Sequence, residues 1–215
     1  MDGGGSRHMT QHPETIGVVL AGGLARRMGG GDKGSSLING RTIMARLVGA
    51  LRPQCTDLIL NANGDPGRFA ALGLPVVPDT IPDFAGPLAG VLAGLDWAAQ
   101  HRPGTAWIAT IAGDTPFLPG DYVARLHAAR DEAGVALASA ASGGRTHPVN
   151  GLWRVSLRDD LRESLARGER KVGQWTADHG AVTVEWSGEP DPFFNVNAPG
   201  DLAEARRMAA AQASQ

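Results

Sequence analysis

Near its N-terminus the chain reads Ile16-Gly-Val-Val-Leu-Ala-Gly-Gly-Leu-Ala-Arg-Arg-Met-Gly-Gly-Gly-Asp-Lys-Gly34. The apolar run 16–20 predicts a short buried strand. The next part, 20–34, holds six glycines in fifteen residues, which lets backbone N–H groups approach an anion closely. A strand that runs into such a loop is typical of an α/β sheet, whose ligands bind at the carboxyl ends of the strands.

Three cations lie within this loop, Arg26, Arg27 and Lys33. Guanidinium and ammonium groups beside free N–H donors suit a polyphosphate. Glycines here also serve simple chain reversal, and Arg26 is as readily explained as a surface residue. Arg27 and Lys33 are the stronger candidates for a ligand site. The spacing matches neither the P-loop nor the dinucleotide-binding fingerprint.

Apolar runs alternate with helical patterns along the rest of the chain, which predicts a three-layer, Rossmann-like α/β fold with a mostly parallel sheet and helices on both faces. The first four strands are largely apolar, as expected of strands covered on both faces. Helices are expected at 42–51 and 87–99, from Ser156 to about Ala166, and after Pro119 and Pro199. The predicted strands are 16–20, 57–61, 76–77, 106–112, 135–140, 149–155 and 182–186.

Length and composition fit one compact globular domain. The chain has 215 residues, of which 42% are hydrophobic and 20% charged. Residues 1–8 resemble an expression leader before a natural start at Met9, so we expect a single domain over 9–215. Glycine remains frequent, at 30 residues, or about twice its usual share.

Charge and cysteine content exclude several classes of partner. The formal net charge is -2, so the composition shows no basic excess for nucleic acid. No apolar run approaches the ~20 residues that span a membrane. The single Cys55 cannot form an internal disulfide, and we expect a reducing, cytoplasmic setting.

One carboxylate stands at the end of an apolar strand. The predicted strand 106–112 leads to Asp114, where α/β sheets place ligands. Mg²⁺ prefers oxygen ligands and uses few protein carboxylates together with substrate phosphates, so one aspartate can suffice. An aspartate that caps the turn before Pro116 would have the same position in the sequence.

Other polar residues follow predicted strands. Asn61 closes one strand and Asp79 follows another, although both are also ordinary turn formers. Asn195 and Asn197 are two residues apart, on one face of an extended segment. Their amides could bind phosphate or metal-bound water, or could cap the helix beginning near Pro199.

Several motifs recur in the order seen in one known family: Leu20-Ala-Gly-Gly, Arg26-Arg-Met-Gly-Gly and Asp32-Lys-Gly, then Gly86-Pro-Leu-Ala-Gly90, Gly113-Asp-Thr-Pro-Phe117, His147-Pro148, Gly168-Glu-Arg-Lys-Val172 and Phe194-Asn-Val-Asn197. Together they resemble the molybdenum cofactor guanylyltransferases, the MobA family of nucleotidyltransferases. The resemblance covers the chain from Ile16 to about Met208. It implies a nucleotide-diphospho-sugar transferase, or GT-A-like, fold.

The resemblance also implies roles for individual residues. Asp114 matches the metal-binding aspartate, with Mg²⁺ as cofactor and Mn²⁺ as an alternative. Asn197 is expected near the metal and the acceptor phosphate. The catalytic candidates are Arg27, Lys33, Asp114 and Asn197, with Arg27 and Lys33 expected to stabilise the departing pyrophosphate. Candidates for the pterin substrate are His147, Arg170, Lys171, Asn195 and Asn197, although Arg170 and Lys171 are equally well explained as surface charges. The nucleotide candidates are Leu20, Ala21, Gly22, Gly23, Lys33, Asn61, Asp79 and Asp114.

The implied reaction is transfer of GMP from GTP to the phosphate of molybdopterin, with pyrophosphate as the second product. The implied partners are GTP, the pterin and proteins of molybdenum cofactor biosynthesis or cofactor acceptors. Rivals are a cytidylyltransferase for the same pterin, a sugar-phosphate nucleotidyltransferase, and a regulatory module that binds nucleotide without turnover. Related enzymes that use other nucleotides often have Ala-Ala-Gly where this chain has Ala21-Gly22-Gly23, which favours guanine.

Overall fold

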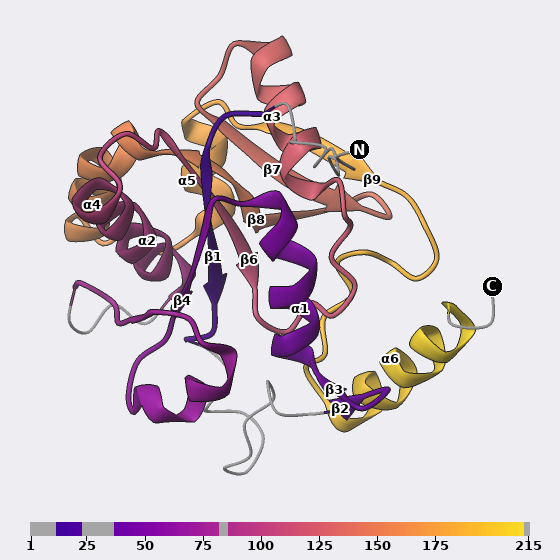
Figure 1. The fold of residues 1–215 in the computed structure, drawn as a ribbon. Coiled ribbons are helices and arrows are strands. Elements are labelled where there is room, and N and C mark those ends of the chain that lie inside the picture. Colours follow the sequence, from indigo (N-terminus) through magenta and orange to yellow (C-terminus); the bar gives the residue numbers. More distant parts are fainter. Residues whose placement is uncertain (1–11, 23–36, 82–85, 213–215) are drawn as a thin grey trace, which may run out of the picture.

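The computed structural model describes residues 12–22, 37–81 and 86–212 (Figure 1). Its centre is a seven-stranded sheet with the strand order β5-β4-β1-β6-β8-β7-β9, and β2 and β3 form a separate hairpin. The strands are β1 (Thr15–Leu20), β2 (Leu37–Ile38), β3 (Arg41–Thr42), β4 (Asp57–Asn61), β5 (Val76–Val77), β6 (Trp107–Ala112), β7 (Leu137–Ser142), β8 (Arg145–Arg154) and β9 (Val182–Trp186).

Most neighbours in the sheet are parallel, which confirms the predicted fold class. β1 pairs in parallel with β4 and β6, β4 with β5, and β7 with β9. Only β8, among the described strands of this sheet, runs antiparallel to its two neighbours, β6 and β7. The carboxyl ends of β1, β4, β5 and β6 therefore meet at one edge of the sheet.

Helices cover both faces of the sheet and give three layers (Figure 1). The helices are α1 (Ile43–Leu51), α2 (Pro87–His101), α3 (Tyr122–Ala133), α4 (Arg158–Ala166), α5 (Val172–Asp178) and α6 (Pro199–Gln212). On one face α2 packs over β1, β4 and β6, with α4 against α2 and α5 against β8, and these elements share one apolar cluster. On the other face α1 and α3 share a second apolar cluster, in which α3 packs over β7, β8 and β9.

The alternation of side chains along β1 explains this sandwich. Ile16 and Val18 point to the α2 side, whereas Val19 belongs to the cluster on the α1 side. All three are fully buried. Gly17 also faces the α1 side, where a Cβ atom would lie 2.3 Å from Leu58 Cδ2. A strand covered on both faces reads as a continuous apolar run, as the sequence of β1 does.

The expected burial of one strand and several predicted boundaries were wrong. β5 lies at the sheet edge and is only half-buried, so it is not a central strand. The strand expected at 135–140 begins later, at Leu137, and the one expected at 149–155 begins earlier, at Arg145. Pro119 precedes α3, and its carbonyl oxygen accepts a hydrogen bond of 2.9 Å from Gln54 Nε2.

The start of α4 also differs from the prediction. The segment Val155–Leu157 forms a 3₁₀ turn, and α4 begins after it at Arg158 without a side-chain cap. The predicted start of α6 at Pro199 is confirmed. The start of α1 follows Thr42, whose Oγ1 accepts a hydrogen bond of 3.0 Å from Ala45 N.

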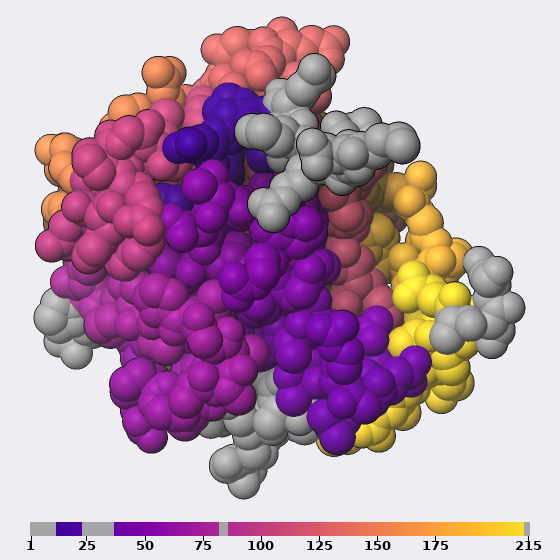
Figure 2. All heavy atoms as spheres, viewed as in Figure 1, coloured from indigo at the N-terminus to yellow at the C-terminus, as the bar shows by residue number. Residues whose placement is uncertain are grey.

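The C-terminal helix α6 packs on the β2–β3 hairpin. Ile38 and Ile43 share a small apolar cluster with Val196, Ala205 and Ala209, and Arg206 Nε donates a hydrogen bond of 2.9 Å to Leu37 O. Figure 2 shows the helix surface, in yellow, against the purple surface of the hairpin and the start of α1. Residues far apart in the sequence thus meet beside the ligand edge of the sheet.

The helices of residues 12–22, 37–81 and 86–212 include none that is both long and apolar enough to cross a lipid bilayer. The predicted leader at 1–8 lies outside the described residues, so the division into leader and domain stays a prediction.

Candidate functional site

The central strand β1 delivers the first site residues. Ala21 N donates a hydrogen bond of 2.8 Å to Asn61 O, and Gly113 N donates one of 3.0 Å to Leu20 O. These two bonds extend the pairing of β1 with β4 and β6 one residue beyond the strands. They hold Leu20, Ala21 and Gly22 between the ends of the neighbouring strands, as predicted for a ligand edge.

Other nucleotide and catalytic candidates lie outside the described residues. They are Gly23, Arg27 and Lys33, together with the surface candidate Arg26, and all belong to the segment 23–36. Their roles stay predictions.

Asn61 and Asp79 contact each other. Asn61 is buried, and its Nδ2 donates hydrogen bonds to Asp79 Oδ1 at 3.0 Å and to Val77 O at 3.1 Å. Asn61 ends β4 and Asp79 lies two residues after the neighbouring strand β5, and together they form one polar unit. The structure therefore brings together two residues that the sequence could equally explain as separate turn formers.

Asn63 completes this unit and was missed in the sequence. Its Nδ2 donates a hydrogen bond of 2.7 Å to Asp79 Oδ2, and its Oδ1 accepts one of 2.9 Å from Asp79 N. Each oxygen of the Asp79 carboxylate is therefore held by a different asparagine. The available signal was the spacing of Asn61 and Asn63, two residues apart at the end of a predicted strand.

The amino end of α2 packs directly against Asn61. A Cβ atom on Gly90 would lie 2.3 Å from Asn61 Oδ1 and 2.9 Å from Leu20 Cδ2, so a side chain at this position would collide with both. Pro87 is the first residue of the helix, where a missing N–H costs nothing. The motif Gly86-Pro-Leu-Ala-Gly90 thus lets a helix N-terminus, with its partial positive charge, approach the ligand edge.

Asp114 lies in the turn after β6. It is half-buried, and its Oδ1 atom is shielded from solvent. The turn is closed by a hydrogen bond of 3.3 Å from Thr115 N to Ala112 O. The predicted position of this carboxylate, at the carboxyl ends of the parallel strands, is confirmed. The hydrogen bond from Gly113 N to Leu20 O places the Asp114 turn beside the end of β1.

A second missed residue, Asn150, holds the end of β6. Its side chain is 2% exposed, and Oδ1 accepts a hydrogen bond of 2.9 Å from Ala112 N. The pairing of β7 with β8 shifts register between Ser139 and Ala140, opposite this part of β8. Asn150 thus supplies the acceptor for Ala112 N, which lies two residues before Asp114. The bond is next to a β-bulge, and such irregularities re-aim side chains.

The segment after β9 reaches Asp114 from the other end of the chain. Val196 N donates a hydrogen bond of 3.0 Å to Asp114 O, and Thr115 Oγ1 donates one of 3.1 Å to Asn195 Oδ1. Asn197 is exposed, and its backbone N donates to Asp201 Oδ2 at 2.8 Å in the first turn of α6. Asn195 thus contacts the carboxylate turn and Asn197 lies just before α6, while the roles of both amides in ligand binding or helix capping stay predictions.

His147 lies in β8, next to the segment that carries Asn195. Its Nε2 is 2.9 Å from Ser142 Oγ, and its ring centroid is 5.2 Å from that of Phe193, two residues before Asn195. Burial lowers the pKa of His147, with Arg145 acting in the same direction against the raising effects of Asp191 and Glu185. The neutral ring is thereby favoured.

Arg170 and Lys171 lie in the connection between α4 and α5. Both are exposed, and their backbone N atoms donate hydrogen bonds of 2.7 and 2.6 Å to Glu169 Oε1. Arg170 Nη1 also donates a hydrogen bond of 3.2 Å to Leu165 O, which ties this side chain to the end of α4. These contacts are local to the connection, so a role of Arg170 and Lys171 in binding the pterin stays a prediction.

The atoms around the Asp114 turn that could ligate a metal ion fit a hard cation. They are oxygens, from the Asp114 carboxylate and the Asn195 side chain, and Mg²⁺ and Mn²⁺ favour oxygen ligands. The described residues include no cluster of three or more histidine, cysteine or acidic side chains that could hold a metal ion. Asp114 is the residue that would hold such an ion, with substrate phosphates and water supplying the other ligands.

Comparisons with known proteins agree with this geometry. A family model described as MobA-like NTP transferase domain matches residues 17–182. The chain is 57% identical over 200 residues to the molybdenum cofactor guanylyltransferase of Nitrobacter hamburgensis, covering 92% of this chain and 96% of the relative. It is 60% identical over 196 residues to that of Bradyrhizobium sp. (strain ORS 278), covering 90% and 92%.

Solved structures share the fold. Molybdopterin-guanine dinucleotide biosynthesis protein A from Archaeoglobus fulgidus superposes with a TM-score of 0.72 at 21% identity, covering 91% of this chain and 99% of that one. Rv0371C from Mycobacterium tuberculosis, solved in complex with manganese, superposes with a TM-score of 0.63 at 19% identity, covering 90% and 98%.

Proposed function

The chain belongs to the molybdenum cofactor guanylyltransferases, within the MobA-like NTP transferases, and we propose that it transfers GMP from GTP to the phosphate of molybdopterin, with or without bound molybdenum. The products are the molybdopterin guanine dinucleotide cofactor and pyrophosphate. The protein is thus a nucleotidyltransferase of molybdenum cofactor biosynthesis, with GTP and molybdopterin as its substrates.

The observation that carries this proposal is the set of contacts at one sheet edge. Ala21 is bonded to Asn61, and Asn61 to Asp79, while Gly113 links β1 to the Asp114 turn. We assign nucleotide binding to Ala21, Asn61 and Asp79, together with Gly22, Gly23, Lys33 and the amino end of α2. The acceptor phosphate then approaches from the Asp114 and Asn195 side.

The chemistry needs positioning more than a reactive side chain. An oxygen of the pterin phosphate attacks the α-phosphorus of GTP, a new P–O bond forms, and the bond to the bridging oxygen of pyrophosphate breaks. A phosphate acceptor is already ionised near neutral pH, so neither a protein nucleophile nor a general base is required. The protein gains rate by holding the two phosphates in line and by balancing their charge.

Mg²⁺, or Mn²⁺ in its place, would neutralise charge on the phosphate oxygens, and Asp114 is the carboxylate that we propose holds it. Arg27 and Lys33 are proposed to stabilise the departing pyrophosphate, because they lie among the glycines of the predicted phosphate loop.

On the acceptor side we propose Asn195 and Asn197 as amide ligands of the pterin phosphate. Support comes from Asn195 Oδ1, which accepts from Thr115 Oγ1 directly after Asp114. His147, Arg170 and Lys171 are proposed to contact the pterin. We further propose a cytoplasmic location and contact with proteins that make or receive the cofactor.

The test is pyrophosphate release with molybdopterin and either GTP or CTP, alongside thermal stabilisation by each nucleotide. We expect release with GTP and stabilisation by GTP above CTP. Equal rates with both nucleotides would contradict guanine selectivity, and stabilisation without release would favour a module that binds nucleotide but does not turn it over. Lys33→Ala should weaken GTP binding, and unchanged binding would remove Lys33 from the site.

A further inference from the structure

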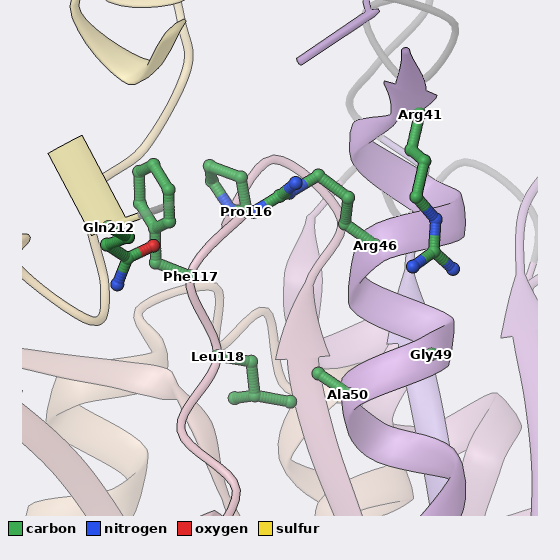
Figure 3. A pocket seen from close by; sticks show the side chains of 8 residues that line it. All are labelled: Arg41, Arg46, Gly49, Ala50, Pro116, Phe117, Leu118 and Gln212. Atoms are coloured by element: carbon green, nitrogen blue, oxygen red, sulfur yellow. The ribbon is translucent and has the colours of Figure 1, made fainter. Parts of the chain in front are cut away.

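A cavity of about 420 Å³ lies beside the proposed active site, between α1, the loop after Asp114 and the end of α6 (Figure 3). None of the residues assigned to the nucleotide or the pterin lines it. Its volume falls within the usual range of small-molecule sites. The lining residues are Arg41, Arg46, Gly49, Ala50, Pro116, Phe117, Leu118 and Gln212.

Arg46 crosses this cavity. Figure 3 shows its side chain extending from α1 toward Pro116 and Phe117, and its Cζ atom is 6.0 Å from the centroid of the Phe117 ring. The Nε atom is buried and has no hydrogen-bond acceptor among the described residues. Burial lowers the pKa of Arg46, and the positive charge of Arg41 lowers it further.

Arg41 provides the second cation. This residue lies in β3, and its side chain runs along α1, where its Nη2 donates a hydrogen bond of 3.4 Å to Ala45 O. A Cβ atom on Gly49 would lie 3.2 Å from the same nitrogen, so glycine at this helix position leaves room for the guanidinium. Gly49 therefore contributes to the shape of the cavity through the side chain that it lacks.

The two cations are not neutralised within the described part of the chain. Several arginines elsewhere in that part form ion pairs with aspartate or glutamate, whereas no such pair within it includes Arg41 or Arg46. Two cations that line one concave, partly desolvated site attract an anion more strongly than isolated surface charges do.

We propose that this cavity is a second anion site, separate from the nucleotide site, that binds a phosphate-class oxyanion through Arg41 and Arg46. The planar guanidinium donates paired N–H groups to phosphate oxygens, and two cations match an anion with about two negative charges. Inorganic phosphate, pyrophosphate and the terminal phosphate of a nucleotide share this chemistry. The inference does not depend on the proposed function.

The test follows the side-chain Nε–H signal of Arg46 by ¹⁵N–¹H NMR in the full chain without GTP or pterin. Arg46→Gln identifies the signal by its loss. Phosphate, pyrophosphate and GTP are titrated separately, which distinguishes the three sources. We expect a saturable shift of the Arg46 signal with at least one of them.

Variants separate the two sites. Arg41→Gln changes an exposed position. It should raise, by roughly tenfold, the Kd of the oxyanion that shifts the Arg46 signal, as expected for a lost hydrogen bond to a charged group. The matched control Arg52→Gln, an exposed arginine just after the same helix, should leave affinity unchanged. In Lys33→Ala, which alters the proposed nucleotide site, the shift of the Arg46 signal should persist.

An Arg46 signal that none of the three anions moves would overturn the proposal. Loss of the shift in Lys33→Ala would also overturn it, because a single nucleotide site would then explain the response. Acetate serves as a carboxylate probe, and a response equal to that of phosphate at equal concentration would refute selectivity for the phosphate class. None of these outcomes bears on whether GMP transfer occurs.

Discussion

Val196 N donates a hydrogen bond of 3.0 Å to Asp114 O. This bond joins the turn that carries the proposed metal ligand to the segment that carries Asn195 and Asn197. The adjacent bond from Thr115 to Asn195 spans 80 positions of the sequence. The turn with the proposed metal ligand and the segment with the proposed acceptor ligands are therefore held together by one backbone and one side-chain hydrogen bond.

Asp114→Asn should lower the rate of pyrophosphate release by at least about a hundredfold, because electrostatic stabilisation of the phosphate groups provides much of the rate acceleration in such transfers. The amide keeps the shape of the side chain, so thermal stability should change little. Glu132→Gln on the exposed surface of α3 is the matched acid-to-amide control. Retained turnover in Asp114→Asn with a folded protein would exclude its role with the metal.

Gly90→Ala should weaken GTP binding and destabilise the fold by about 1–3 kcal/mol, because the new Cβ would collide with Asn61 Oδ1 and Leu20 Cδ2. Urea unfolding and the KM for GTP measure the two effects. Gly104→Ala is the matched control, since a Cβ there meets nothing within 4 Å. Equal effects of the two variants would show that the contact of α2 with Asn61 is unimportant.

Asn63→Ala and Asp79→Asn should be non-additive in GTP affinity. Asn63 makes two hydrogen bonds with Asp79, so removing either partner disturbs the same unit. A double-mutant cycle should give a coupling of roughly 0.5–3 kcal/mol. Strict additivity would mean that Asn63 does not position Asp79.

Asn150→Ala should destabilise the protein by about 1–3 kcal/mol, because it leaves the half-buried Ala112 N without its acceptor. If the bond also positions Asp114, kcat should fall while the KM for GTP changes little. Unfolding curves and steady-state kinetics distinguish these effects. A stability loss with unchanged kcat would limit Asn150 to a structural role.

His127 should make stability depend on pH. Burial, with smaller contributions from His12 and Arg130, lowers the pKa of His127 to about 3, below the ordinary value of 6.5. The unfolded chain therefore takes up a proton that the folded chain does not. The stabilising contribution is complete above about pH 6.5 and is lost as pH falls toward 3, by at most about 1.4 kcal/mol per unit.

Unfolding free energies measured between pH 7 and pH 4 check this dependence. His127→Gln should flatten the curve, and the exposed His101→Gln should leave it as in the natural protein. A curve of equal slope in His127→Gln would assign the dependence to other groups.

The strands at 57–61, 76–77 and 182–186 have the bounds predicted from their apolar and alternating patterns. Such patterns are local, because burial on one or both faces determines which residue types a strand tolerates. The position of Asp114 follows from the same logic, since the apolar run before it ends two residues earlier. α3 begins later than predicted, at Tyr122, and Pro119 O accepts a hydrogen bond from Gln54, a distant partner that no local pattern reveals.

Asn63 and Asn150 show where a local pattern carries too little information. Each is a polar residue near a strand end, which is also the ordinary composition of a turn. Their importance comes from partners on other strands, Asp79 for one and Ala112 for the other. The cavity of Arg41 and Arg46 likewise depends on α6 and the loop after Asp114, which are remote from α1 in the sequence.

The sequence by itself determined the α/β class, the buried first strand that ends at Leu20, and the family, because periodicity and short motifs are properties of neighbouring residues. Only the tertiary structure decided that β1 lies between β4 and β6, that β8 runs antiparallel beside β6, and that Val196 meets Asp114. These relationships depend on how all the apolar faces are buried together, and that collective packing is not encoded in any single segment.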